Sequence, residues 1–358
     1  MRTLLGVEHP IFGFSPSEHV AAAVSRAGGL GVLGCVRFND PADLEAALAY
    51  MDDNTDGKPY GVDIVMPASV PIETDLQSQI PFGHKDFVEE TLLKLGVPPL
   101  PPDRPVSDGV LGWLHSVARS HVEVALRHRP RLIANALGPP PADVVGKAHE
   151  HGMLVAALAG KAEHARHHVA LGVDVIVAQG YEAGGHTGEI ASMVLVPEVV
   201  DAVGDSVPVL AAGGIGSGRQ VAAALALGAS GAWMGSAWLV SQEYRMSTAS
   251  VRTALLRATS SDTVRSRIYT GKPARLLRNK WTDAWAAPGA PAPLPMPLQN
   301  LLVSEAHQRL MHADDPDVVP IPVGQIVGRM NSVRPVAAIM ADIVSELRAT
   351  LTRLGSLD

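Results

Sequence analysis

The chain has little that could hold it together covalently, and few aromatic side chains. Its 358 residues include one cysteine, Cys35, which excludes both a disulfide framework and a cysteine-based zinc site within one chain. A single cysteine fits a reducing compartment, so we expect a cytoplasmic protein. Aromatic residues make up only 4% and apolar residues 47%, so the core must be built from Ala, Val, Leu and Ile. This composition favours parallel strands between helices over an all-β sandwich.

Basic clusters and long uninterrupted apolar runs are also scarce. The net charge is −7 and no basic patch is visible, which argues against nucleic acid as the main partner. No long apolar run follows Met1, so we expect no signal peptide. The uncharged stretch from Gln220 to Gln242 contains glycine and serine, and its composition changes midway. We therefore expect a helix followed by a buried strand there, and no membrane span.

Short apolar runs alternate with Ala-rich helical patterns along much of the chain. Alternating strands and helices indicate βαβ units and a parallel sheet. Eight such units predict the α/β class and a closed (β/α)8 TIM barrel. The predicted strands are Pro10–Gly13, Leu30–Gly34, Tyr60–Val65, Arg131–Ala136, Met153–Leu158, Val173–Gln179, Pro208–Ala212 and Gly231–Gly235.

The regular alternation breaks twice, and this predicts the domain organisation. Residues 1–242 are expected to form the barrel, with an insertion at about 67–130 that carries the proline cluster Val97–Pro105. Residues 243–322 show helical patterns without strands, which predicts a mainly helical cap over the barrel mouth. Residues 323–358 form a C-terminal segment whose helix, at Pro335–Leu354, is expected to return to the barrel.

One glycine-rich stretch follows the sixth predicted strand and carries a histidine. Gln179 and Gly180 end the strand, and Gly185 and His186 follow among small residues. Glycine lets the backbone approach a ligand closely, and an imidazole with a pKa near 6.5 suits proton transfer at neutral pH. The alternative is that His186 is an ordinary surface histidine without a role, since the chain has 14 histidines in all. No H-x-x-x-H or histidine–carboxylate cluster is convincing as a ligand set, since His164, His167 and His168 fit a solvated helix face. We therefore expect no metal, and we expect Glu182 to pair with a neighbour.

Two more glycine-rich stretches follow the seventh and eighth predicted strands. Gly213 and Gly214 lead toward a helix, and Gly235 and Ser236 end the eighth strand. Free N–H groups at a helix N-terminus bind phosphate, and the loops after strands seven and eight of a barrel are a frequent phosphate site. The spacing does not match a Rossmann fingerprint. The alternative, that these glycines only permit tight turns, stays open.

These stretches resemble the nitronate monooxygenases, formerly called 2-nitropropane dioxygenases. The resemblance implies a TIM barrel that binds FMN and oxidises alkyl nitronates, or nitroalkanes, with O2. Further matching segments are Ala21–Gly31, Ala211–Ile215, Met234–Ser236, Tyr269–Arg275 and Gly324–Gly328.

The resemblance also implies roles for individual residues. Gln179 and Gly180 would face the ring and ribityl chain of the flavin. His186 matches the catalytic histidine of the family, which acts as a base or holds an anionic substrate. The residues at the FMN phosphate would be Gly213, Gly214, Gly235 and Ser236, with Gly185 nearby.

Two positions on the flavin side depart from the family pattern. Relatives usually carry Ala-Pro-Met after the first strand, and the corresponding stretch here, Phe12-Gly13-Phe14-Ser15-Pro16-Ser17, is shorter and lacks the methionine. Asp63 lies where many relatives have asparagine. A carboxylate near an electron-rich flavin would disfavour the reduced anion unless it is protonated or paired. Two alternatives therefore stay open: an NAD(P)H-dependent flavin reductase of the quinone or enoyl-ACP type, and a non-catalytic barrel used for binding. We expect a small-molecule substrate, no nucleic-acid or membrane partner, and allow for a homodimer.

Overall fold

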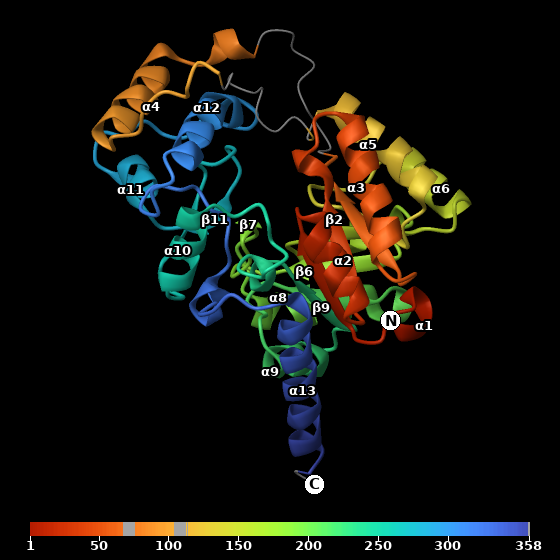
Figure 1. The fold of residues 1–358 in the computed structure, drawn as a ribbon. Coiled ribbons are helices and arrows are strands. Elements are labelled where there is room, and N and C mark those ends of the chain that lie inside the picture. The colour runs from red at the N-terminus through yellow and green to blue at the C-terminus, as the bar shows by residue number, and fades with distance from the viewer. Residues whose placement is uncertain (67–75, 104–111, 113, 357–358) are drawn as a thin grey trace.

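A closed barrel of eight parallel strands forms the body of the molecule (Figure 1). The computed structural model describes residues 1–66, 76–103, 112 and 114–356. Every predicted strand is present within two residues of its expected bounds, so the (β/α)8 prediction is confirmed. The strands, in barrel order, are β1 (Ile11–Ser15), β2 (Leu30–Gly34), β3 (Tyr60–Ile64), β4 (Leu132–Asn135), β5 (Leu154–Ala159), β6 (Val175–Gln179), β8 (Val209–Ala212) and β9 (Gly231–Met234).

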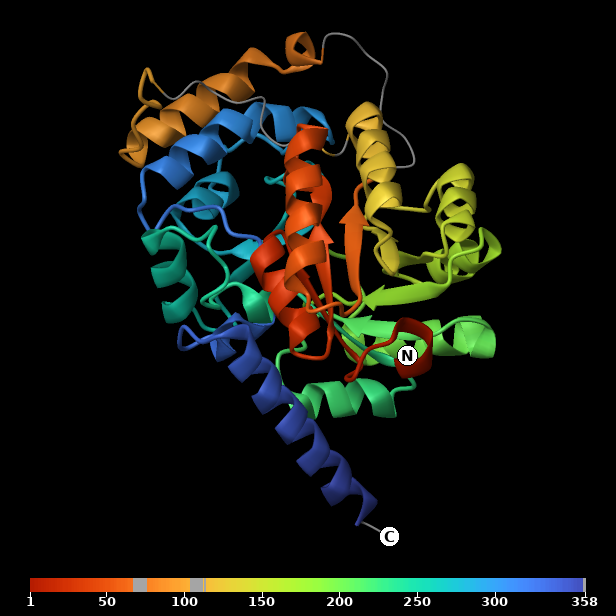
Figure 2. The ribbon, with the colours of Figure 1, turned by 45° about the vertical axis from the view of Figure 1, so that its right-hand side comes forward.

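Helices cover the outside of the barrel, and the last of them comes from the far end of the chain. α13 (Val336–Gly355) packs against both α9 and α2, so it occupies the eighth helix position of the ring. Its C-terminal end extends beyond the body of the molecule (Figure 2). The other helices of this layer are α2 (Glu18–Arg26), α3 (Pro41–Asn54), α5 (His115–His128), α6 (Ala142–Glu150), α7 (Ala162–Ala170), α8 (Ser192–Val203) and α9 (Gly218–Ala226), and a short α1 (Arg2–Leu5) precedes β1.

The strands are buried on both faces, as the apolar composition requires. Along each strand one set of side chains fills the barrel, as Phe12, Val32 and Val177 do. The alternate set, which includes Val62 and Ile176, packs against the helices. Because parallel strands in a barrel have no solvated face, they form nearly continuous apolar runs. This is why the sequence pattern located them well.

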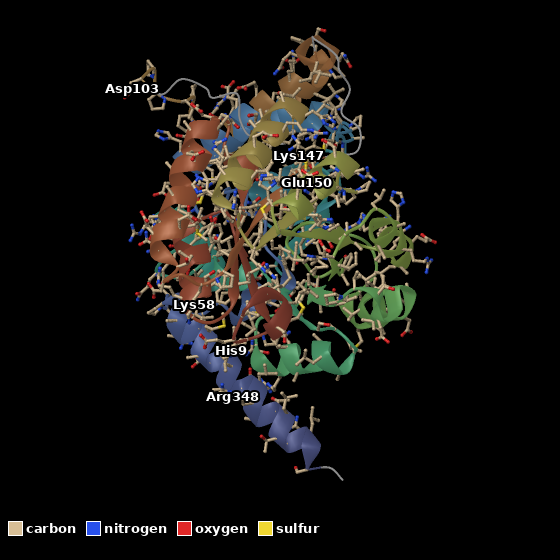
Figure 3. The ribbon with its side chains drawn as sticks, turned by 90° about the vertical axis from the view of Figure 1, so that its right-hand side faces the viewer. His9, Lys58, Asp103, Lys147, Glu150 and Arg348 are labelled. Carbon is tan, nitrogen blue, oxygen red and sulfur yellow. The ribbon has the colours of Figure 1, made fainter. Side chains whose placement is uncertain are left out.

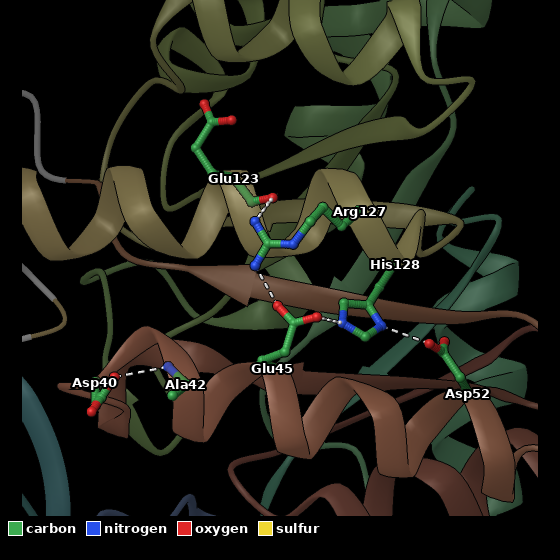
Figure 4. Close-up of polar contacts among 7 residues, drawn as sticks. All are labelled: Asp40, Ala42, Glu45, Asp52, Glu123, Arg127 and His128. Carbon is green, nitrogen blue, oxygen red and sulfur yellow. Dashed lines mark hydrogen bonds and ion pairs between the residues drawn. The ribbon is translucent and has the colours of Figure 1, made fainter.

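α5 belongs to the barrel layer, which shortens the predicted insertion. Its His128 ring lies 2.6 Å from Asp52 and 2.9 Å from Glu45, both on α3 (Figure 4). Arg127 also donates to Glu45, so two residues of α5 hold the neighbouring helix. The segment that leaves the barrel therefore ends before α5, and the predicted limit near residue 130 is wrong. Residues 67–75, 104–111 and 113 of the predicted insertion lie outside the described residues.

The cap contains strands that the sequence pattern did not predict. β10 (Thr263–Ser266) and β11 (Ala274–Leu277) form an antiparallel pair, and β11 also pairs with β7 (Gly185–His186). The expectation of a cap segment without strands is thus wrong, because these strands are short and carry polar residues that hide the usual apolar alternation. The cap helices are α10 (Ala249–Arg257), α11 (Lys280–Ala286) and α12 (Leu298–His312), and α4 (Phe82–Lys94) from the insertion packs on α12.

Charged side chains lie on the outer surface of the barrel layer. Figure 3 labels some of them: Lys147 and Glu150 of α6 and Arg348 of α13 are exposed, and Lys58 before β3 is half-buried. Within the residues that the structure describes, no helix is long and apolar enough to cross a membrane. The uncharged stretch from Gln220 to Gln242 divides between α9 and β9, as predicted.

Candidate functional site

Three predicted residues face the mouth of the barrel from the carboxyl ends of β1, β3 and β6. Side chains alternate along a strand, so Phe14 and Gln179 point to the same side as the inner-core residues two positions earlier. The Phe14 ring lies over β2, since a Cβ on Gly34 would stand only 3.0 Å from it. The Gln179 amide is half-buried and makes no hydrogen bond with the described residues. Its amide group is therefore available to a ligand at the mouth.

Asp63 carries a buried carboxyl group near the end of β3. It is 5% exposed, and its neighbours Val62 and Ile64 face the outer core, so Asp63 faces inward. Among the described residues none hydrogen-bonds its Oδ1. Burial raises the pKa of Asp63 to about 8. At neutral pH the group is mainly a protonated acid, which removes the conflict between a carboxylate and an electron-rich ring.

The loop after β6 is held by its own hydrogen bonds. The Ser192 backbone N–H and hydroxyl donate to the Glu182 carboxylate at 3.0 and 2.8 Å, so Glu182 pairs with a neighbour as expected. Thr187 Oγ1 donates to the Gly180 carbonyl at 2.7 Å. A Cβ on Gly180 would stand 2.1 Å from Ser192 Oγ, so glycine is required there. These contacts fix the path of the chain up to His186.

His186 is positioned by the cap as well as by its own loop. It pairs with Ala274 in the β7–β11 ladder, and its Nε2 lies 2.7 Å from Thr270 Oγ1. Burial, aided by the nearby Lys272 cation, lowers the pKa of His186 to about 4. The imidazole is therefore neutral at neutral pH. A neutral ring can accept a proton at one nitrogen and donate a hydrogen bond from the other.

The loops after β8 and β9 bring together four of the predicted glycine and serine positions. Gly213 and Gly214 have φ values of +96° and +71°, and β8 and β9 are adjacent in the barrel. In the part of the chain that the structure describes, no acceptor takes the backbone N–H groups of Gly213, Gly214 or Ser236. The Ser236 hydroxyl accepts the Gly324 N–H at 2.8 Å. Gly235 begins the loop after β9, and a Cβ on it would stand 3.5 Å from the Phe14 ring. A Cβ on Gly185 would meet no atom within 4 Å.

The N-terminus of α9 does not supply the free N–H groups that the sequence suggested. The Glu346 carboxylate of α13 accepts from Gly218 N at 2.8 Å and from Arg219 N at 3.4 Å. The Ser217 hydroxyl accepts from Gln220 N at 3.4 Å. This expectation is wrong because the eighth helix brings its own carboxylate to the helix end. The open donors lie one loop earlier, at Gly213 and Gly214.

Comparisons with known proteins identify the family of this chain. The family model for nitronate monooxygenase matches residues 3–346. The chain belongs to the nitronate monooxygenase family. It is therefore a flavin-dependent oxidoreductase, in a family of enzymes that act on small molecules with oxygen.

Relatives in this family match nearly the whole chain. The Mycobacterium tuberculosis protein "Putative monooxygenase Rv1533" is 50% identical over 370 residues, which cover 99% of this chain and 97% of that protein. A "Probable nitronate monooxygenase" of Staphylococcus aureus (strain Newman) is 27% identical over 96% of both chains. A nitroalkane oxidase structure from Streptomyces ansochromogenes has a TM-score of 0.83 at 28% identity and 99% coverage of both chains. FabK from Thermotoga maritima has a TM-score of 0.74 at 27% identity, covering 100% and 98%.

The candidate site includes residues to which the sequence assigned no role. Thr270 contacts His186, although 84 residues separate them. Arg275 is 2% exposed and donates to the Tyr181 carbonyl from Nε and Nη2, at 3.1 and 2.9 Å. Gly324 approaches the signature loop so closely that its Cβ would stand 2.8 Å from the Glu182 carbonyl oxygen. All three lie in segments that carry the family resemblance. That resemblance is the sequence feature that could have pointed to them.

Proposed function

We propose that this protein is an FMN-dependent nitronate monooxygenase that oxidises alkyl nitronates with O2, with His186 as the residue that meets the substrate. One observation carries the proposal. The neutral His186 ring and the open N–H groups of Gly213, Gly214 and Ser236 lie on loops that end neighbouring strands of one barrel mouth. A mononucleotide flavin needs a phosphate site and a reactive face in such an arrangement.

The residues at the mouth fit a flavin mononucleotide. Open backbone N–H groups suit a phosphate, and Gly213 leaves no room for a side chain because its Cβ would stand 3.0 Å from the Gly180 carbonyl oxygen. In this proposal Gly235 and Ser236 complete the phosphate site, with Gly185 beside it. When bound, the flavin supplies the electron acceptor, while the protein supplies binding and orientation.

The ring side of the proposed site is formed by Gln179, Gly180, Phe14 and Asp63. The unpaired Gln179 amide can donate to or accept from the polar edge of the ring. The protonated Asp63 can donate a hydrogen bond, as an asparagine at this position would. The departure at Asp63 therefore remains compatible with an electron-rich flavin.

A second candidate is an NAD(P)H-dependent flavin reductase. It is favoured by the likeness to FabK of Thermotoga maritima, which covers the whole chain. The two functions differ in the electron donor. A nitronate is oxidised at its own carbon, whereas a reductase takes a hydride from a nicotinamide.

The test is anaerobic mixing of the purified protein with each donor in turn. We expect a yellow protein with releasable FMN, whose flavin absorbance is bleached by propionate 3-nitronate and not by NADH or NADPH. Bleaching by a nicotinamide alone would select the reductase. A colourless protein that cannot be reconstituted with FMN would instead favour a non-catalytic binding barrel.

A further inference from the structure

The two ring nitrogens of His186 have different surroundings. Nε2 lies 2.7 Å from the hydroxyl of Thr270, a buried residue of the cap. Nδ1 has no hydrogen-bond partner in the described part of the chain, yet it is not one of the fully buried unpartnered polar atoms. Next to it, a Cβ on Gly185 would meet no atom within 4 Å. A molecule that binds at His186 therefore meets Nδ1.

The hydrogen bonds of Thr270 indicate which nitrogen carries the proton. Its Oγ1 accepts the backbone N–H of Lys272 at 3.3 Å, and a hydroxyl has only one hydrogen to donate. Among the described residues, Nε2 of His186 is the acceptor within reach of that hydrogen. If Nε2 carried the proton, the buried hydroxyl hydrogen would have no acceptor. The network thus assigns the proton of the neutral ring to Nδ1.

The contact between Thr270 and His186 is fixed from both sides. Gly271 has a φ of +92°, and its Cβ would stand 2.3 Å from the Met296 nitrogen, so this turn accepts only glycine. The Gly271 N–H also donates to the Arg267 carbonyl at 2.8 Å. On the other side, His186 is held in register with Ala274. Thr270 itself is only 7% exposed.

We infer that Thr270 is a positioning residue that holds His186 as the Nδ1–H tautomer, so that His186 donates a hydrogen bond to a nitronate anion. This rests on the proposed function and adds the tautomer through which His186 meets its substrate. A nitronate has already lost its carbon-bound proton and needs a donor and a nearby cation. A neutral nitroalkane needs a base, and the open Nδ1 is occupied by hydrogen.

The charge near the ring agrees with an anionic ligand. The Lys272 cation lies close enough to His186 to disfavour a second positive charge on the ring. The field of this cation favours an anion over a cation in the neighbourhood of the ring. The sign of this field agrees with a nitronate, which is an anion, as the ligand of the Nδ1 donor.

The first experiment measures the tautomer directly, without turnover. Long-range ¹H–¹⁵N spectra of the histidine-labelled protein would be compared for the wild type, Thr270→Ser and Thr270→Val, with His186→Asn to assign the signal among the 14 histidines. We expect the Nδ1–H form in the wild type and in Thr270→Ser, and a shift toward Nε2–H in Thr270→Val. An Nε2–H wild type, or a Thr270→Val protein that keeps the wild-type form, would overturn the inference.

The second experiment measures substrate preference. We expect the wild type to consume preformed nitronate at least about a hundredfold faster, in kcat/KM, than freshly dissolved neutral nitroalkane, which is the scale of a missing general base. Thr270→Val should raise KM for nitronate about tenfold, the loss of one good hydrogen bond, and Thr270→Ser should restore it. Equal use of both substrates would overturn the inference.

The two proposals fail in different ways. Unchanged nitronate turnover in His186→Asn would remove His186 from the reaction and so overturn the proposed function. An inactive His186→Asn protein together with an Nε2–H wild type would overturn only the role of Thr270. The spectra do not depend on turnover, so each result can be obtained whatever the other shows.

Discussion

At the scale of single residues, burial sets the charge at the barrel mouth. Asp63 and His186 are both neutral near pH 7, the first because burial raises its pKa and the second because burial lowers it. The sequence identified both residues as notable, but it could not reveal either protonation state. Protonation depends on the surrounding atoms, and Asp63 turned out to have no partner for Oδ1 among the described residues.

The neutral state of Asp63 predicts how stability depends on pH. An unfolded aspartate titrates near 3.9, whereas the folded pKa is about 8. Between these values the folded chain keeps a proton that the unfolded chain has released, so stability falls as pH rises. Asp63→Asn has no such proton. As pH rises through this window, its free energy of unfolding should increase relative to that of the wild type by up to about 1.4 kcal/mol per pH unit.

Urea unfolding of both proteins at pH 5 and pH 8 measures this gain. Asp53→Asn is the matched control, because Asp53 lies exposed on α3 and is not taken out of water. The control should show no comparable gain. If Asp63→Asn and the wild type differ by the same amount at both pH values, Asp63 is ionised in the folded chain and the neutral-acid interpretation is wrong.

At the scale of elements, apolar periodicity located the barrel strands and failed for the cap strands. The barrel strands are buried on both faces and are read directly from runs such as Val175–Gln179. β10 is half-buried along its whole length, and β11 carries the buried Arg275. Thr270 was missed for a related reason. It reaches His186 from the segment just before β11, and β11 pairs with β7, which carries His186. A local pattern cannot report such a pairing.

The junction of α13 and α9 gives an element-scale prediction. Glu346 accepts from Gly218 N and Arg219 N, so a carboxylate of another helix adds to the Ser217 side-chain cap of α9. Glu346→Ala should lower the free energy of unfolding by about 1 kcal/mol, the usual cost of a lost cap. Amide hydrogen exchange should also accelerate at Gly218 and Arg219.

Arg348→Ala provides the control for this junction, since Arg348 is an exposed residue of the same helix. It should leave both measurements unchanged. If amide exchange at the start of α9 were as slow in Glu346→Ala as in the wild type, water would satisfy these N–H groups. Glu346 would then not anchor the eighth helix.

At the scale of the whole molecule, the cap is assembled from two distant parts of the chain. α4, from the segment after β3, packs on α12, which follows the last barrel strand. Arg309 joins them: it donates to both Glu89 carboxylate oxygens, at 3.0 and 2.8 Å, and to the carbonyls of Pro98 and Val97, at 3.1 and 3.3 Å. The sequence predicted a cap and an insertion as separate pieces. Their union depends on a contact between residues 220 positions apart.

Arg309→Met should release α4 without unfolding the barrel. The substitution keeps an apolar side chain of similar length but leaves the Val97 and Pro98 carbonyls without their donor, a loss of about 2 kcal/mol in the cap. Hydrogen exchange should therefore rise over residues 82–98 while the barrel strands keep their protection. Arg278→Met is the matched control. Arg278 pairs with Asp283 at the surface of the same cap, and its side chain does not bond to Glu89 or to the Val97 and Pro98 carbonyls. If the barrel strands lost protection together with α4, the cap and barrel would unfold as one cooperative unit, and the separate docking of α4 would be excluded.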